Sequence, residues 1–472
     1  MPVRPKQSER RGLDVPAGVP RGRELGRTVN YEHAVSVYGR RDLEFFTSQY
    51  NTGDELGYAA YRALKAIGGD GKSMFDQALE HGIESVSDAP AELVALFESV
   101  DNVPDWVDRS QLRRGSVAYW RHGKLVVMAL AYAAIGAGFR SYGGTRSLVM
   151  SRRLIERDQV GRRLIETLRW AATSTRPGAM DRYGDGFRLT MQVRWIHAAV
   201  RYHLSRSDAW DWDDWGLVVS NVDSIYTMGS SFCEAVVVAL EKAGVKITQH
   251  EKEDITAMWR YIGHVIGLPE DVNFRNWSDL RRKSGMVRIL EHPADDGSRA
   301  LMTSLTDYMC EEKIDGYQVL PAFIDNRLAP HQKRRLTYGL MRSWAGDDVC
   351  DELEIANSRL RYLLPAAKPL IVAYDRICRV LPHDDEIKAM RTLDAFGVAT
   401  ATRDGESDVA DADDVVQGFV RNSARARDLF TRRAAFTRRK ASRRSKSQTW
   451  GIRSTGTAVS GSAPARSSTR PR

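Results

Sequence analysis

Apolar residues recur at helical spacing through nearly all of residues 30–395, and this periodicity is the feature that most limits the possible folds. An apolar side chain at every third or fourth position suits an α-helix, whereas a half-buried strand needs a strict alternation that this sequence almost never shows. The breaks between helical segments carry Gly or Pro, as at Pro90, Pro104 and Pro177. No Pro-, Ser- or Gly-rich linker divides the segment. The sequence therefore predicts an all-α fold with a single globular domain.

The same periodicity predicts approximate helix bounds. The predicted helices cover Tyr31–Phe46, Gly53–Ile67, Lys72–His81, Ala89–Ser99, Ser110–Phe139, Met150–Ser174, Gly186–Ser205, Val222–Ala243, His250–Ile266, Asn276–Glu291, Ser298–Glu311, Pro330–Leu340 and Asp347–Leu363. The strongest apolar run, Leu125–Phe139, has 15 residues. A membrane span needs about 20 residues. The small residues in the run instead favour a helix that is buried on all sides.

Positive charge is concentrated at the C-terminal end. From Arg421 onward, 15 Lys and Arg face one acidic residue, Asp428, so this part carries +14 and the preceding 420 residues carry −5 of the total +9. Its Ser, Thr, Ala and Gly cannot bury enough apolar surface to offset chain entropy. We therefore expect three parts: a basic, disordered extension over 1–29, a helical domain over 30–400, and a basic, disordered tail over 401–472.

The tail has two possible roles, and the sequence leaves both open. It can be a solvated, solubilising segment, or it can adhere to acidic lipid or nucleic acid through its charge. Recognition of a specific nucleic acid is not expected. No apolar segment follows Arg10–Arg11, as a secretory signal would require, and the four cysteines form neither a metal motif nor a disulfide framework. We expect a cytoplasmic protein, either free or peripheral at an anionic membrane.

Several catalytic motifs are absent. Residues 66–73 end like a phosphate-binding loop, but Ala66 stands where the first glycine is required. None of the ten histidines has a carboxylate three residues before it, which excludes the Glu-x-x-His pairs of helical di-iron proteins. Neither the His-Glu-x-x-His zinc motif nor the Gly-x-Ser-x-Gly elbow occurs.

One predicted helix carries a histidine on its apolar stripe. In residues 186–204, His197 is preceded by Arg194 at three residues and followed by Arg201 at four, so all three project along one face. Haem would suit this arrangement, since iron binds a neutral imidazole and the two propionates pair with guanidinium groups. The alternative is a hydrogen-bonded core histidine with both arginines turned to solvent. Spacing alone leaves both open.

The segment Val193–Arg201 resembles the most recognisable motif of the rubber-oxygenase family, which includes latex clearing proteins and a fungal oxygenase of the mycophenolic acid pathway. Further landmarks of that family occur in the same order, and the resemblance covers roughly residues 30–370. These landmarks are Val103–Asp108, the Gly-rich helix at 125–139, Gly143–Leu148, Gly161–Thr167 and Trp259–Pro269.

The resemblance implies a helical fold around a b-type haem, with His197 as the iron ligand. It places Arg163, Glu166 and Thr167 on the opposite, distal side. Latex clearing proteins have a lysine where Glu166 stands, and that lysine can serve as a second axial ligand or as a base. Glu166 can instead accept a proton, or it can pair with an arginine of its own helix at the surface. Arg327 is a further candidate partner for a propionate, unless it pairs with Asp325.

The expected function is therefore that of a haem b-dependent oxygenase. It would use dioxygen and a lipophilic, possibly isoprenoid-like small molecule, with Arg163 and Thr167 polarising dioxygen and Glu166 positioning or taking a proton. A different class also remains open. The chain could be a non-catalytic helical binding or scaffold protein that its tail holds to acidic membrane or nucleic acid. A Soret band in the purified protein would distinguish the two.

Overall fold

The computed structural model describes residues 13–151, 157–311, 327–380 and 384–400. Within these ranges every regular element is helical, and the β contact is an isolated antiparallel bridge between Thr28 and Glu291. The prediction of an all-α fold is confirmed. The tail over 401–472 and the first 12 residues lie outside the described residues, so the disorder expected there stays a prediction.

The helices follow one another along the chain with short connections. The elements are η2 Gly22–Glu24, α1 Tyr31–Tyr38, α2 Arg40–Ser48, η3 Gln49–Asn51, α3 Glu55–Ile67, α4 Gly69–His81, η4 Ile83–Ser85, α5 Ala91–Asp101, α6 Arg109–Trp120, α7 Lys124–Ala129, η5 Leu130–Ala134, α8 Ile135–Arg140, α9 Arg146–Ser151, α10 Arg157–Ser174, α11 Asp185–Leu204, α12 Trp212–Trp215, α13 Asn221–Ile225, η6 Tyr226–Ala235, α14 Val236–Ala243, α15 Gln249–Val265, α16 Trp277–Leu290, α17 Asp296–Glu311, α19 Pro330–Trp344, α20 Asp347–Glu352, η7 Arg359–Tyr362, α21 Leu363–Val380 and α22 Asp385–Thr400. Of these, η5 and η6 are π-helical.

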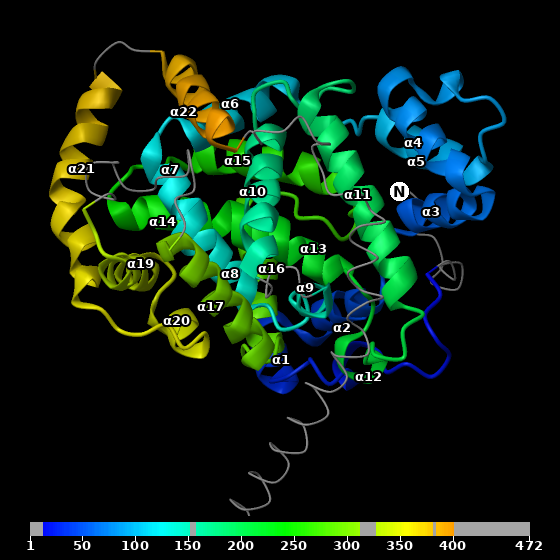
Figure 1. Cartoon of the computed structure of the whole chain (residues 1–472), viewed down its shortest axis with the longest axis horizontal. Helices are drawn as coiled ribbons and strands as arrows, with labels where there is room; N and C mark the ends of the chain where they lie inside the picture. The colour runs from blue at the N-terminus through cyan, green and yellow to red at the C-terminus, as the bar shows by residue number, and fades with distance from the viewer. Residues whose placement is uncertain (1–12, 152–156, 312–326, 381–383, 401–472) are drawn as a thin grey trace, which may run out of the picture. The chain divides into compact units, whose positions relative to one another are not determined.

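A buried rod made of α13, η6 and α14 lies at the centre of the fold (Figure 1). The π-helical η6 packs against α15, α16, α8 and the second π-helix, η5. Side chains of η6 donate to carbonyl groups of its neighbours: Ser231 Oγ donates to the Ala134 carbonyl of η5 at 2.6 Å, and the Tyr226 hydroxyl donates to the Ala137 carbonyl of α8 at 2.7 Å. These bonds join η6 to η5 and to α8 through the core, where an unpaired carbonyl would be costly.

The predicted helix over 110–139 is wrong in one respect, because the structure divides it. The chain turns at residues 121–123 between α6 and α7, where Gly123 has a φ of 60° that side-chain-bearing residues rarely adopt. The apolar run itself is helical and largely buried, as predicted. In the described part of the chain, no single helix is long and apolar enough to cross a membrane. The pair α6 and α7–α8 meets those criteria jointly but bends by 84°.

The C-terminal part of the domain also differs from the prediction. Instead of one helix over 347–363, α20 ends at Glu352, Glu354 adopts a left-handed φ of 56°, and η7 leads into α21. Neither α21 nor α22 was among the predicted helices. Pro365 and Pro369 make the start of α21 look like a break. Pro365 is in the first turn, where its missing N–H would be unpaired anyway, whereas Pro369 lies inside the helix and removes one intrahelical bond.

The prediction of a disordered extension over residues 1–29 is wrong for residues 13–29, because these residues are packed into the fold. Leu25 is buried in a cluster with helices α1, α2, α13 and α16. Arg27 is 1% exposed and forms ion pairs with Asp223, at 2.7 Å, and with Glu291. The two carboxylates explain why Arg27, a basic residue in a polar segment, can be buried.

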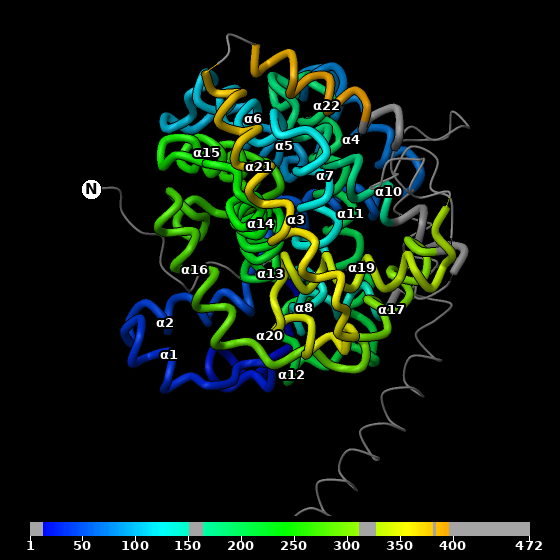
Figure 2. The backbone as a smooth tube through the Cα atoms, turned by 90° about the vertical axis from the view of Figure 1, so that its left-hand side faces the viewer, coloured from blue at the N-terminus to red at the C-terminus, as the bar shows by residue number. Residues whose placement is uncertain are grey.

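The helices α10 and α11 form a hairpin that positions the candidate site. In Figure 1 they lie side by side near the turn at 175–184 and diverge away from it. Helices α3, α4 and α5 form a group beside α11, with contacts between α11 and both α3 and α4. On the opposite side of the domain, α21 lies over α14 and α19, as Figure 2 shows.

Candidate functional site

The register between α10 and α11 is set by Thr190. Trp170 Nε1 donates to Thr190 Oγ1 at 3.3 Å, and Ser174 Oγ lies 3.0 Å from the same oxygen. Trp170 and Ser174 are one turn apart on α10, so this stripe faces α11. The chain reverses direction through residues 175–184, and the two helices are therefore antiparallel. A residue later in α11 therefore lies opposite a residue earlier in α10.

This register places His197 opposite the predicted distal residues. His197 follows Thr190 by seven residues, which is two helical turns, and so shares its face. Thr167 precedes Ser174 by seven residues and so lies on the stripe of α10 that faces α11, and Arg163 precedes Trp170 by the same number of residues. Glu166 lies next to that stripe. The side chains of His197, Glu166 and Thr167 are half-buried; that of Arg163 lies outside the described part of the structure.

The surroundings of this stripe are apolar and aromatic. On α10, Leu164 and Leu168 are buried, and on α11, Ile196 and Val200 are buried. The Trp170 ring packs edge-on against Phe232 of η6 at 5.6 Å and lies 6.0 Å from Trp259 of α15. Phe232 and Trp259 stack at 5.5 Å. The π-helix η6 thus supports the hairpin through an aromatic cluster, which is the kind of wall that a flat apolar ligand requires.

Arg194 is buried, and a protein carboxylate binds it. Its Nε and Nη2 donate to the two carboxylate oxygens of Asp54 at 2.8 and 2.7 Å, and its Nη1 donates to the Val265 carbonyl at 3.1 Å. Asp54 also accepts a bond from Gly57 N and so caps α3. Burial alone would raise the pKa of Asp54, but Arg194 and then Arg201 hold this pKa below its ordinary value. The pair is an internal ion pair with two-point geometry.

Arg201 is fully buried and donates to carbonyl groups. Its Nε bonds the Val218 carbonyl at 3.0 Å and its Nη2 bonds the Val219 carbonyl at 2.7 Å, while Nη1 reaches the Asp54 carbonyl at 3.4 Å. Neither arginine turns to solvent. Both were expected to pair with haem propionates, but their donors are largely taken by the protein. The structure thus supports another role: they fix α11 to α3 and to the loop before α13.

Arg327 lies exposed at the edge of the described residues. Its alternative partner, Asp325, falls within the range 312–326 that the structure does not describe. The assignment of Arg327 to a propionate therefore stays a prediction.

His264, which belongs to the landmark segment Trp259–Pro269, lies on α15 in a packed setting. Its ring stacks on Tyr261 at 6.1 Å, and its buried Nε2 has no hydrogen-bond partner among the residues that the structure describes. Burial, followed by the positive charge of Arg194, lowers the pKa of His264, so its ring is neutral near pH 7. These features indicate a core-packing role for His264.

The glycine-rich landmark at 143–148 has a structural role. A Cβ on Gly143 would lie 1.7 Å from Cζ of Arg27, and Gly143 N donates to Glu291 at 2.9 Å. Arg146 in the same segment is held by both oxygens of Asp295 at 2.7 Å. The segment therefore joins the N-terminal residues to α16 and α17. Sequence reasoning did not find this network, since its members are far apart along the chain.

The donor set suits a haem better than a metal ion bound by side chains alone. Among the described residues no three His, Cys, Asp or Glu side chains lie close enough together to hold a metal. A single imidazole at His197 binds iron stably only where another ligand, such as a porphyrin, supplies the remaining donors. The antiparallel, diverging hairpin with its apolar walls is compatible with such a flat ligand. The residues present therefore fit a haem, apart from Arg194 and Arg201, whose donors are largely taken by the protein.

Comparison with known proteins identifies the family. The model described as "ER-bound oxygenase mpaB/B'/Rubber oxygenase, catalytic domain" matches residues 113–383. The chain belongs to this family. The matched range contains α10, α11 and all the site residues named from the sequence, so the family resemblance inferred there is confirmed. Asp54 and the residues around Arg27 lie before the matched range.

Two relatives within the rubber-oxygenase group are similar over most of the domain. A rubber oxygenase from Streptomyces sp. (strain K30) is 24% identical over 308 residues, which is 63% of this chain and 68% of that protein. The solved structure of latex clearing protein in the closed state has a TM-score of 0.51 at 20% identity, and the match covers 73% of this chain and 91% of that one. The match to this solved structure shows a shared fold.

Proposed function

We propose that this chain binds one b-type haem between α10 and α11 and oxygenates a lipophilic, isoprenoid-like substrate. The observation that carries the proposal is the register of the hairpin, which sets His197 on one helix level with residues 163–167 on the other. Membership of an oxygenase family supports the reaction class. Haem, when bound, would supply the redox chemistry that activates dioxygen.

The chain's own residues would bind, orient and transfer protons. His197 would hold the iron through its neutral ring, while the Arg194–Asp54 pair would keep α11 in place as a positioning device. On α10, Thr167 would donate a hydrogen bond from its hydroxyl, and Arg163 would contribute positive charge. Glu166 would accept or hold a proton at its carboxylate. The aromatic wall around Trp170 would exclude water and favour an apolar substrate.

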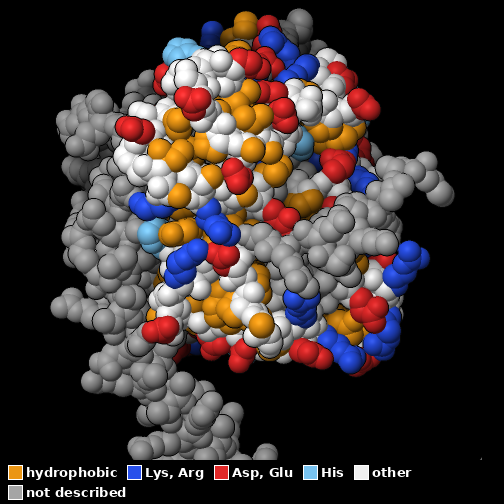
Figure 3. Space-filling model, turned by 90° about the vertical axis from the view of Figure 1, so that its right-hand side faces the viewer, with side chains coloured by type: hydrophobic (Ala, Val, Ile, Leu, Met, Phe, Trp, Pro, Cys, Tyr) orange, Lys and Arg blue, Asp and Glu red, His pale blue; other side chains and the backbone are white. Residues whose placement is uncertain are grey.

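The scaffold alternative requires a surface that binds acidic partners. Figure 3 shows the face over α3–α5 and α11, where Lys and Arg side chains alternate with Asp and Glu and form no continuous basic stripe. On this face, the described residues give no support to nucleic-acid binding. Peripheral contact with an anionic membrane would then depend on the basic tail. The free cysteines of the described domain suit the reducing cytoplasm that we propose as its location.

Titration of the purified apoprotein with hemin should give a Soret band that saturates at about one haem per chain. Oxygen uptake by the loaded protein should then rise with an apolar polyisoprenoid and stay at background with a water-soluble analogue of similar size. Bovine serum albumin, which binds hemin without this hairpin, serves as the control for loosely bound haem. A protein that acquires no saturable Soret band would support the scaffold alternative.

Glu166 gives the haem proposal a spectroscopic test. A carboxylate is a weaker ligand for ferric iron than an amine, so the resting wild-type protein should be high-spin, with five ligands or a weakly held water. Glu166→Lys should become low-spin at alkaline pH, as the new amine loses its proton. Glu166→Gln, which cannot supply an amine, should stay high-spin across the same range. A wild-type spectrum that is fully low-spin at neutral pH would show that another residue closes the distal side.

A further inference from the structure

The outward face of α21 is apolar. Five large side chains on this face are between 48% and 83% exposed: Leu363, Leu370, Tyr374, Ile377 and Val380. The helix forms the edge of the domain in Figure 1 and crosses the front of it in Figure 2. A soluble monomer rarely gathers so many exposed apolar side chains on one helix. This face therefore indicates a binding surface.

The exposed apolar residues follow the spacing of a seam between two paired helices. Six apolar residues, separated by alternating steps of three and four, are all exposed: Leu363, Ala366, Leu370, Ala373, Ile377 and Val380. They match the a and d positions of a coiled coil, where the side chains of one helix pack between those of another. The seam runs from the first residue of α21 to the last. The face that a pairing helix gives to its partner is thus the face that α21 gives to solvent.

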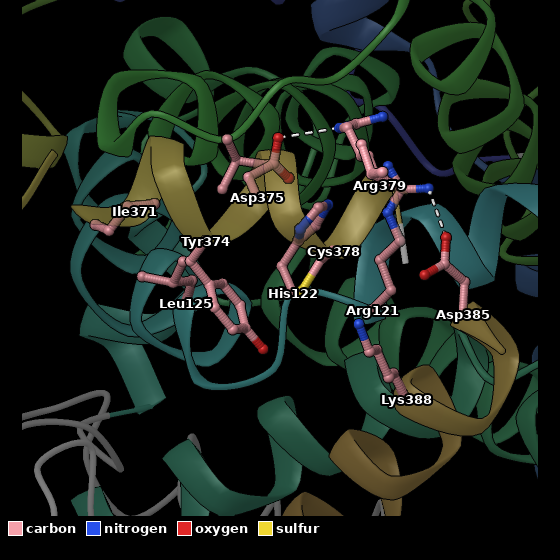
Figure 4. A pocket seen from close by; sticks show the side chains of 12 residues that line it. Arg121, His122, Leu125, Ile371, Tyr374, Asp375, Cys378, Arg379, Asp385 and Lys388 are labelled. Atoms are coloured by element: carbon pink, nitrogen blue, oxygen red, sulfur yellow. Dashed lines mark hydrogen bonds and ion pairs between the residues drawn. The ribbon is translucent and has the colours of Figure 1, made fainter. Parts of the chain in front are cut away.

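The opposite face of α21 attaches the helix to the domain. Leu364 is buried there, and Asp375 accepts a bond from the backbone N–H of Lys246 at 3.3 Å. Asp375 also pairs with Arg379 at 3.0 Å. Figure 4 shows Ile371, Asp375 and Arg379 on this side, at a cavity of about 430 Å³ beside the turn between α6 and α7. The inner face thus holds α21 in place and leaves the seam accessible.

The seam is complementary in size to a second copy of itself in the antiparallel direction. With a two-fold axis between residues 371 and 372, each a position lies beside a d position of the other copy, and the contact is the same for both copies. The layers across this axis are Leu363 with Val380, Leu370 with Ala373, and Ile377 with Ala366. Leu370 and Ile377 each meet an alanine, which lets the helices approach closely. A parallel pair would instead leave layers that contain only alanine.

Charge also favours the antiparallel pair. The outward face carries one charged residue, Arg376, at the flank of the seam. In a parallel pair the two copies of Arg376 would lie side by side and repel each other. In the antiparallel pair Arg376 lies opposite Ala367 of the second copy, and the two arginines are separated by roughly 13 Å along the helix axis. That separation exceeds the Debye length of about 8 Å, so salt screens the repulsion.

The exposed apolar surface is sufficient for a dimer contact. The five large side chains together expose roughly 500 Å², at about 150–250 Å² for each fully exposed side chain. Two copies would therefore bury about 1,000 Å², which is the lower limit of a specific interface. This area suits a reversible dimer better than an obligate one.

We propose that α21 forms the contact of a two-fold symmetric homodimer, in which the α21 helices of two copies of this chain pack antiparallel. A lipid surface fits the seam less well, because the alanines in the middle of the strip would contribute little to insertion. The contact does not include the α10–α11 hairpin. It is therefore independent of the haem proposal.

Sedimentation equilibrium of the full chain tests the dimer. We expect a reversible monomer–dimer equilibrium. Leu370→Lys should raise the dimer Kd about a hundredfold or more, because it would bury two like charges close to the axis. Leu56→Lys is the matched control, since Leu56 is an exposed leucine of α3 and lies outside the seam. It should leave the Kd unchanged. Circular dichroism checks that each variant is folded.

A size exchange tests the packing within the contact. Ala373→Leu should raise the Kd about tenfold or more, because two leucines would crowd one layer. Leu370→Ala combined with Ala373→Leu exchanges the large and small residues of that layer and should restore the Kd to within a few-fold of wild type. A lipid surface predicts the opposite for Ala373→Leu, which would then strengthen binding to anionic vesicles.

Cysteine cross-linking tests the direction of the helices. In a Cys378→Ser background the remaining cysteines are buried. Ala366→Cys combined with Ile377→Cys should give a disulfide-linked dimer on mild oxidation, whereas either substitution alone should not. A chain that stays monomeric at every concentration, or a dimer that Leu370→Lys leaves unchanged, would overturn the proposal. Vesicle binding by a monomer, strengthened by Ala373→Leu, would assign the seam to a membrane instead.

Discussion

Replacing His197 by alanine should abolish stoichiometric haem retention. In the α10–α11 register, His197 is the imidazole level with residues 163–167, and under the proposed function its removal would leave the iron without a protein ligand on that side. Hemin titration followed at the Soret maximum should change from saturable binding to weak, non-saturating absorbance. The helical content measured by circular dichroism should be retained, because the half-buried His197 side chain contributes little to the core.

His264→Ala is the matched control for this experiment. His264 is also a partly buried helical histidine, but it stacks on Tyr261 and lies on α15 rather than on the hairpin. It should retain haem at about one per chain. A normal Soret band in His197→Ala, or its loss in His264→Ala, would contradict the assignment of the ligand.

Asp54→Ala should produce the largest loss of stability. The substitution leaves the buried guanidinium of Arg194 without its carboxylate and removes the negative charge that acts most strongly on Arg201. It also deletes the N-cap of α3. Breaking a buried pair in this way costs about 3–5 kcal/mol, measurable as a shift of the urea midpoint at unchanged slope. Asp54→Asn keeps a capping oxygen and should lose less.

The pH dependence of this effect has a definite sign. Because the folded-state pKa of Asp54 is below its ordinary value, its ionised form stabilises the fold fully above the unfolded pKa, which is near 4. The advantage of wild type over Asp54→Ala should therefore be constant from about pH 5 to 8. It should shrink as the pH falls through the folded-state pKa. An advantage that grows in acid would contradict the assigned charge state.

Asp76→Ala is the comparison for an exposed pair. Asp76 pairs with Lys72 one turn away, and both side chains are more than 40% exposed. Solvent screening should limit its effect to about 0.5 kcal/mol. If the two variants destabilise the protein equally, Asp54 is not the anchor of α11 that the structure indicates.

Local patterns were sufficient for the helical class and for most of the helices. The three-to-four-residue period predicted the all-α class, and it placed Arg194, His197 and Arg201 on one helix, which the structure has as α11. Such inferences succeed because helical geometry depends on neighbours within a few residues. Motif order then identified the family, whose model matches residues 113–383.

The partners of those same residues were decided only by the tertiary structure. The sequence could not show that Arg194 meets Asp54, 140 residues earlier, or that Arg27 is buried between Asp223 and Glu291. An arginine near a histidine looks the same in sequence whether its guanidinium meets a cofactor, a carboxylate or water. Its partner is chosen by long-range packing, which brings distant carboxylates into a low-dielectric interior where unpaired charge is costly.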